Sequence, residues 1–192
     1  MDLILELTKR LDQLAAQQPL PQDSHVQLQD AGRQLDCVIV AAEQLACSLR
    51  EVTVEEYIAP TSGVAGPSAS GAAGASASAA QRLRQVCDDL ARRLCYLNEP
   101  ISVIEIDKVG GVGQLRSVAP SPAASGVPAA TAPSSTGPPG NRYFEVVVNQ
   151  AGSINVRRYE KQPGLPRQLI PATLTREIFL QLATDLWNTR LV

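Results

Sequence analysis

The residues of this chain best suited to chemistry are a basic and aromatic set near its C-terminus. They are Arg142, Tyr143, Arg157, Arg158, Tyr159 and Lys161. Cationic side chains neutralise phosphates and tyrosine rings stack on bases, which is how sheet surfaces bind single-stranded nucleic acid. Glu145 and Glu160 lie among them, so the competing interpretation is a solvated sheet face with cross-strand charge pairs. We favour the charge pairs and keep the anion or nucleic-acid patch as the alternative.

Other residues that carry chemistry lack the partners that catalysis or metal binding requires. His25 is the only histidine, so a metal site built on histidines has no support. Asp88 and Asp89 are adjacent and would point about 100° apart on a helix. With Arg92 and Arg93 they predict ion pairs on a solvated helix face. We therefore expect no enzyme, no catalytic residue, no metal and no cofactor.

The glycine-rich segment 108–113 is similar in composition to a phosphate-binding loop. Such a loop needs a lysine followed by serine or threonine at the start of a helix. Here Lys108 precedes Val109, and the alternating pattern of a strand follows Gly111. The segment therefore predicts a hairpin turn. A small enzyme with an unrecognised site is the third hypothesis for this chain.

The cysteines and the N-terminus bear on location. Four cysteines lie in helix-like patterns, and none has the two-residue spacing of a zinc or redox pair. We expect buried thiols. The first residues contain an early acid and no long apolar run, and no window approaches the roughly 20 apolar residues of a membrane helix. These features predict a cytoplasmic protein that does not bind a membrane.

Charge is distributed unevenly along the chain, whose formal net charge is −2. Residues 1–58 contain four basic and ten acidic side chains, whereas residues 141–192 contain seven basic and four acidic ones. Opposite charge at the two ends predicts either self-docking or a separate anionic partner for the C-terminal part. Two solvated surfaces that merely differ in charge are the competing interpretation.

The secondary-structure elements that position these groups are predicted from apolar spacing. The first pattern is a ladder of apolar residues spaced by three and four. Its members are Leu28, Ala31, Leu35, Val38, Ala42, Leu45, Leu49 and Val52. This spacing predicts a helix over residues 25–54 with one apolar seam, preceded by a shorter helix over residues 2–18. The shorter helix would leave part of the seam uncovered. We therefore expect a coiled coil whose partner or oligomer interface is Leu28, Leu35, Val38, Leu45, Leu49 and Val52.

Composition divides the chain into three parts. Residues 1–58 form the expected helical hairpin, and residues 59–79 are a low-complexity linker that cannot offset its own chain entropy. Residues 80–192 are expected to form an α+β domain with a flexible insert at 119–141. Within it we expect a helix over 79–98, hairpins over 101–118 and 142–159, an extended piece at 168–170, and a helix capped by Thr173. The predicted fold is therefore α+β, with an antiparallel sheet of four or five strands.

These observations favour a non-enzymatic protein-interaction or assembly protein, a scaffold that self-associates or docks through its heptad helix. Its partner would be another protein or a second copy of the chain. A module that binds single-stranded nucleic acid through a basic sheet face is the alternative.

Overall fold

The protein is dominated by one antiparallel sheet. The computed structural model describes residues 2–17, 20, 23–57, 72–97, 99–118 and 141–191. Three α-helices, one short 3₁₀ helix and nine strands occur in this part of the chain. In chain order they are α1 (Leu3–Ala16), β1 (Ser24–Asp30), β2 (Arg33–Ala42), β3 (Ala46–Glu56), α2 (Ala72–Arg93), η1 (Leu94–Leu97), β4 (Ile101–Asp107), β5 (Val112–Ser117), β6 (Asn141–Asn149), β7 (Ser153–Lys161), β8 (Gln168–Ile170), β9 (Ala172–Thr175) and α3 (Arg176–Asn188).

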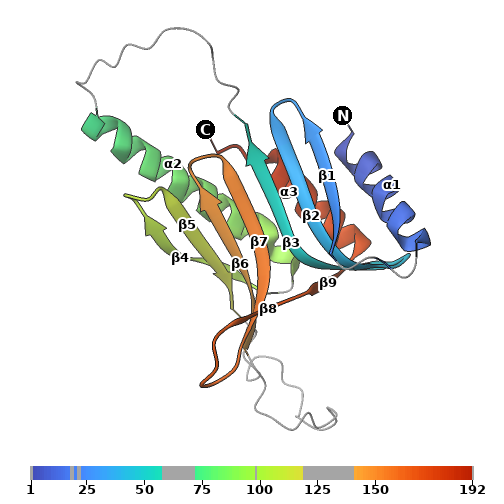
Figure 1. Cartoon of the computed structure of the whole chain (residues 1–192). Helices are drawn as coiled ribbons and strands as arrows, with labels where there is room; N and C mark the ends of the chain where they lie inside the picture. The colour runs from blue at the N-terminus through green and yellow to red at the C-terminus, as the bar shows by residue number, and fades with distance from the viewer. Residues whose placement is uncertain are drawn as a thin grey trace.

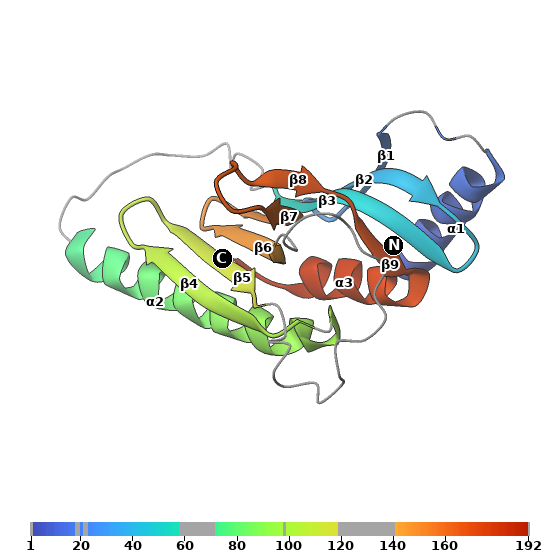
Figure 2. The ribbon, with the colours of Figure 1, turned by 90° about the horizontal axis from the view of Figure 1, so that it is seen from below.

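The sheet is built from two halves of similar plan. In each half a helix is followed by a strand at the outer edge and then by strands that step inward, giving the order β1-β2-β3-β7-β6-β5-β4 (Figure 1). The halves meet where β3 pairs with β7, with Val52 opposite Val156. β9 pairs with β3 and β8 pairs with β7. All three α-helices lie on one side of the sheet (Figure 2).

The prediction of a helical hairpin or coiled coil over residues 1–58 is wrong. Residues 24–56 form three strands, because their burial alternates with a period of two, as at Leu35, Cys37 and Ile39. Ala31 and Gly32, with φ of 49° and 80°, make the tight turn between β1 and β2. Two successive positive φ values are typical of a hairpin turn and cannot occur inside a helix. The sheet therefore has nine strands rather than four or five.

The six residues predicted as an interface are mostly covered by their own chain. Leu28, Leu35, Leu49 and Val52 are buried in the core, with 0% exposure at Leu35. Val38 lies half-buried on the opposite face of β2, and Leu45 is 83% exposed in the turn between β2 and β3. The apolar ladder thus leaves no seam for a partner helix, and the physical basis for docking through such a helix is absent.

The remaining sequence predictions coincide more closely with the structure. Helix α1 and both C-terminal hairpins lie where expected, and α2 with η1 ends one residue before the predicted limit. The last helix is capped by Thr175 rather than Thr173, because residues 172–175 first pair with β3 as a strand. Of the predicted linker and insert, residues 59–71 and 119–140 lie outside the described part, whereas 72–79 belong to α2.

The core lies between the sheet and its helices as one continuous apolar cluster. α1 contributes Leu7 and Leu11, and α3 contributes Phe179 and Leu186, all fully buried. α2 packs on the β4–β5 hairpin so closely that a Cβ atom at residue 113 would overlap the Cys87 sulfur, so this position requires glycine. Strands from both halves contribute to the same cluster, so burial of apolar area stabilises them together.

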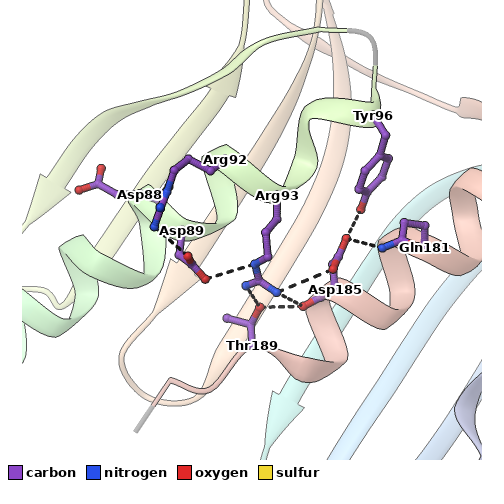
Figure 3. A network of polar contacts seen from close by, with 8 residues as sticks. All are labelled: Asp88, Asp89, Arg92, Arg93, Tyr96, Gln181, Asp185 and Thr189. Carbon is purple, nitrogen blue, oxygen red and sulfur yellow. Dashed lines mark hydrogen bonds and ion pairs between the residues drawn. The ribbon is translucent and has the colours of Figure 1, made fainter.

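A polar network also joins α2 and η1 to α3 (Figure 3). Arg93 pairs with Asp89 at 3.2 Å and donates to the hydroxyl of Thr189 at 2.6 Å. Tyr96 donates to the Asp185 carboxylate at 2.9 Å. Burial, together with this hydrogen bond, raises the pKa of Tyr96. Arg92 pairs with Asp89 as well. Ion pairs along the helix are therefore present as predicted, whereas the contacts of Arg93 with α3 were not predicted from the sequence.

Candidate docking surface

The sheet face opposite the three helices, called here the open face, lies free of helices throughout the described residues (Figures 1 and 2). Alternate side chains of each strand point to this face, as strand geometry requires. An antiparallel sheet commonly leaves one face toward solvent, so its openness alone indicates no function. Its significance lies in the arrangement of charge across it.

A hollow of about 440 Å³ occupies the centre of the open face, across the seam of β3 and β7. Thr53 and Asn155 are paired on this seam, and Ser153 lies next to them on β7. Their short side chains leave space between the longer ones around them. The hollow is lined by Gln34, Asp36, Glu51, Thr53, Glu55, Val147, Ser153, Asn155 and Arg157.

Glu51 is the centre of a hydrogen-bond network in this hollow. One of its oxygens accepts from Arg157 at 2.8 Å, from Thr53 at 3.2 Å, and from the amide of Asn155. Burial opposes ionisation of Glu51, but the hydrogen bonds and the charge of Arg157 outweigh it and lower the pKa of Glu51. The carboxylate is therefore ionised at neutral pH and holds Arg157 over the seam.

This lowered pKa predicts a stability change in acid. The unfolded chain binds a proton at Glu51 near the ordinary value of about 4.3, and the folded chain only at lower pH. The stabilisation is therefore complete above that value and is lost as pH falls through the folded-state pKa. We expect Glu51→Gln to be less stable than wild type at pH 7 and to lose less stability on acidification. Urea unfolding at a series of pH values measures this, and parallel profiles for the two proteins would contradict it.

Carboxylates gather on the β2–β3 side of the hollow, and we call Asp36, Glu51 and Glu55 the acidic cluster. Asp36 accepts from the ring of His25 at 3.2 Å and from Gln27 at 2.9 Å. These two partners lie on the edge strand β1 and orient the carboxylate across the face.

Tyr57 forms the aromatic rim of the acidic cluster. Its hydroxyl lies 3.1 Å from a Glu55 carboxylate oxygen and 3.2 Å from the Gln34 side-chain oxygen, and either oxygen can accept its single proton. The hydrogen bond to the Glu55 carboxylate raises the pKa of Tyr57. The tyrosine is 50% exposed beside the hollow, and exposed tyrosine is enriched in protein interfaces.

The other side of the open face is basic and aromatic. The rings of Tyr143 and Tyr159 stack with centroids 5.9 Å apart. The guanidinium of Arg116 lies 4.6 Å from the ring centre of Tyr143, and that of Arg167 lies 4.4 Å from Tyr159. These four side chains form one continuous stack, in the order Arg116, Tyr143, Tyr159 and Arg167.

Glu145 is the buried anion beneath this stack, and its residue exposure is only 5%. One carboxylate oxygen accepts from Gln114 at 2.7 Å, Arg116 at 3.1 Å and Arg167 at 2.6 Å. Two guanidinium groups therefore share one carboxylate, which leaves positive charge on this side. We call Arg116, Arg157, Lys161 and Arg167 the basic cluster.

The structure divides the predicted nucleic-acid patch between two faces. Tyr143, Tyr159, Arg157 and Lys161 share the open face, since alternate residues of paired strands point the same way. Arg142 and Arg158 lie on the helix side. Arg142 pairs with Glu160 at 2.7 Å, and Arg158 pairs with Glu99 at 2.8 Å.

The tyrosines are also poorly placed to stack on bases. Each ring has the other ring on one side and an arginine near it, Arg116 or Arg167. Tyr143 is only 6% exposed. Base stacking needs a free ring face, so the geometry gives the nucleic-acid hypothesis less support than the sequence pattern does.

The residues that sequence reasoning missed are the acidic cluster and Arg116. Asp36 and Glu51 lie within the helix predicted over residues 25–54 and Glu55 just after it, and the sequence pattern gives none of the three a role. Arg116 lies on β5. It contacts Glu145 because the register of β5 and β6 places these two residues opposite each other. The alternation of Gln114 and Arg116 opposite Glu145 is the one local signal for this contact.

No protein-family model, no curated protein and no solved structure matches the chain. In the part of the chain that the structure describes, none of the helices is both long and apolar enough to span a membrane.

Proposed function

We propose that this protein is a non-enzymatic interaction module that binds another protein surface through the open face of its sheet. The observation that carries the proposal is the distribution of charge on that face: the acidic cluster lies on β2 and β3, the basic cluster lies on β5, β7 and the segment after β7, and the two meet at the Glu51–Arg157 pair. Complementary potentials across an interface select partners and accelerate encounter. This surface replaces the heptad helix as the docking element.

The central hollow supports the same proposal. It offers space for a side chain of the partner on the seam that joins the two halves of the sheet. Carboxylate, amide, hydroxyl and guanidinium groups line it, so the partner group is polar. A fixed polar lining of this kind favours a specific, hydrogen-bonded contact over a nonspecific apolar one.

The proposal extends to a reducing compartment, the cytoplasm. All four cysteines are free thiols, with Cys95 exposed and Cys37, Cys47 and Cys87 buried. Burial raises the pKa of Cys47 to about 12 and that of Cys87 to about 11. Free thiols at this density are typical of proteins from reducing compartments.

A matched pair of variants tests the docking surface. Gln34 lines the hollow, whereas Gln13 is exposed on α1, away from the open face. Baits carrying Gln34→Arg or Gln13→Arg are compared with wild type for the proteins, including this chain itself, that they capture from the native cell extract. We expect Gln34→Arg to lose the captured protein by tenfold or more and Gln13→Arg to retain it, with both baits folded by circular dichroism. Equal capture by both baits, or no capture by wild type, contradicts the proposal.

A further inference from the structure

We infer that the occupant of the open face is a second copy of this chain, packed face to face about a two-fold axis. The inference rests on the proposed function, because it names the partner of the same surface. Three observations carry it: the two clusters lie on opposite sides of one face, each retains unbalanced charge, and the face has the area of a stable interface.

The positions of the two clusters make the face self-complementary. The acidic cluster lies on β2 and β3, and the basic cluster lies on β5, β7 and the segment after β7. A two-fold axis in the plane of the interface, perpendicular to the line between the clusters, places each acidic cluster on the partner's basic cluster. Isologous contacts of this kind close after two subunits. Both ends of the dimer then gain the same contact.

The charges are incompletely balanced within one chain. Asp36 and Glu55 accept hydrogen bonds from uncharged amide and hydroxyl groups or from His25, and neither pairs with lysine or arginine among the described residues. On the other side, Arg116 and Arg167 share Glu145 alone, and Lys161 donates to the carbonyl of Leu165.

The same groups are accessible to a partner. The side chains of Arg167 and Asp36 are 46% and 27% exposed, whereas Arg157, which is 41% exposed, is already paired with Glu51 of the acidic cluster. Glu105 on the outer strand β4 adds one carboxylate to the basic side. The charge complementarity between the two copies is therefore greatest near the β3–β7 seam and declines toward the β4 edge.

The area of the face suits a dimer. Seven strands about 4.8 Å apart and roughly 25 Å long present a face of about 700 Å². Stable interfaces bury about 800 Å² on each partner. The side chains that project from the sheet raise the accessible area above this flat value. One face therefore has about the area that a standard interface buries on each partner.

A charge-exchange experiment tests the inference by sedimentation velocity. The acidic-side variant is Asp36→Lys with Glu55→Lys, and the basic-side variant is Lys161→Glu with Arg167→Glu. We expect wild type to be a dimer that dissociates between about 0.05 M and 0.5 M salt, where screening becomes strong. Each variant alone is expected to bind itself more than about 100-fold more weakly, because like charges then meet. Mixing the two variants is expected to restore the dimer, since every contact is again between opposite charges.

Glu145 loses a partner in the basic-side variant, so Lys161→Gln with Arg167→Gln serves as a milder second version. We expect it to weaken the dimer while keeping the melting temperature of wild type within a few degrees. A wild type that is monomeric in concentrated solution at low salt overturns the inference, as does a dimer that both charge variants retain. If the chain is monomeric but Gln34→Arg still loses a different captured protein, the inference fails and the proposed function stands. If Gln34→Arg changes neither dimerisation nor capture, both fail.

Discussion

Replacing Leu35 by alanine is expected to lower the free energy of unfolding by about 2–5 kcal/mol, whereas the same change at Leu45 leaves it within about 0.5 kcal/mol. Leu35 lies in the middle of β2 with no exposed surface, so its loss leaves a cavity between sheet and helices. Leu45 is 83% exposed in a hairpin turn and packs on little. Substitutions at two leucines of one apolar ladder thus differ by a large fraction of the stability of a small domain, about 5–15 kcal/mol.

Equilibrium urea unfolding of the two variants measures this difference. A heptad helix would bury both leucines on one seam and make the two substitutions comparable. Leu35→Ala and Leu45→Ala with equal effects would therefore contradict the three-stranded arrangement of residues 24–56. Because β3 pairs with β7, we also expect Leu35→Ala to destabilise both halves in a single cooperative transition.

Replacing Arg33 by methionine is expected to cost about 3–5 kcal/mol of stability, the range for breaking a buried ion pair on one side. Arg33 and Glu56 pair at 2.5 Å, with side chains only 5% and 12% exposed. The same guanidinium donates to the carbonyl of Thr189 and lies 5.9 Å from the ring centre of Trp187. The substitution leaves the Glu56 carboxylate in the interior and releases the end of α3 from the sheet.

A second substitution separates the cost of the stranded charge from the loss of packing. Arg33→Met combined with Glu56→Gln is expected to recover part of the stability, because the amide carries no charge to desolvate. Arg190, 3.7 Å from Glu56 and 75% exposed, is too exposed to replace Arg33. Denaturant midpoints of the two single variants and the double variant give the coupling. A loss below about 1 kcal/mol in Arg33→Met would show that this pair does not hold α3 to β2 and β3.

The C-terminal hairpins were predictable because every local signal there agrees. Phe144, Val146 and Val148 recur at every second position of one strand, and Gly152 supplies the positive φ of the turn. In residues 24–56 two periodicities coexist. Ala31 and Leu45 complete the heptad spacing, yet both lie in turns. The β-branched run of residues 38–40 between them is typical of a strand. The Ala31–Gly32 pair, with its turn propensity, is the signal that distinguishes the two.

The candidate surface was predictable only in its charge. The acidic N-terminal part and basic C-terminal part of the chain predict self-docking, an anionic partner or two solvated surfaces that differ in charge, and the structure places acidic and basic groups from both parts on the open face. The surface itself depends on the pairing of Glu51 with Arg157, which are far apart in sequence. No local pattern specifies such a long-range strand pair, because its register is set by packing of the whole core. Arg142 and Arg158 were grouped with their neighbours, although the alternation of side chains along one strand already turns them to the helix side.

Chemical footprinting of carboxylates tests the docking role of the open face most directly. The free chain in dilute solution and the associated state, either concentrated or with the captured protein added, are labelled with a carbodiimide and an amine and compared by mass spectrometry. Labelling at Asp36 and Glu55 is expected to fall severalfold on association, while Glu177, exposed on α3, is labelled equally in both states. Unchanged labelling of Asp36 and Glu55 in an associated sample, with protection at Glu177 instead, would contradict this role for the open face.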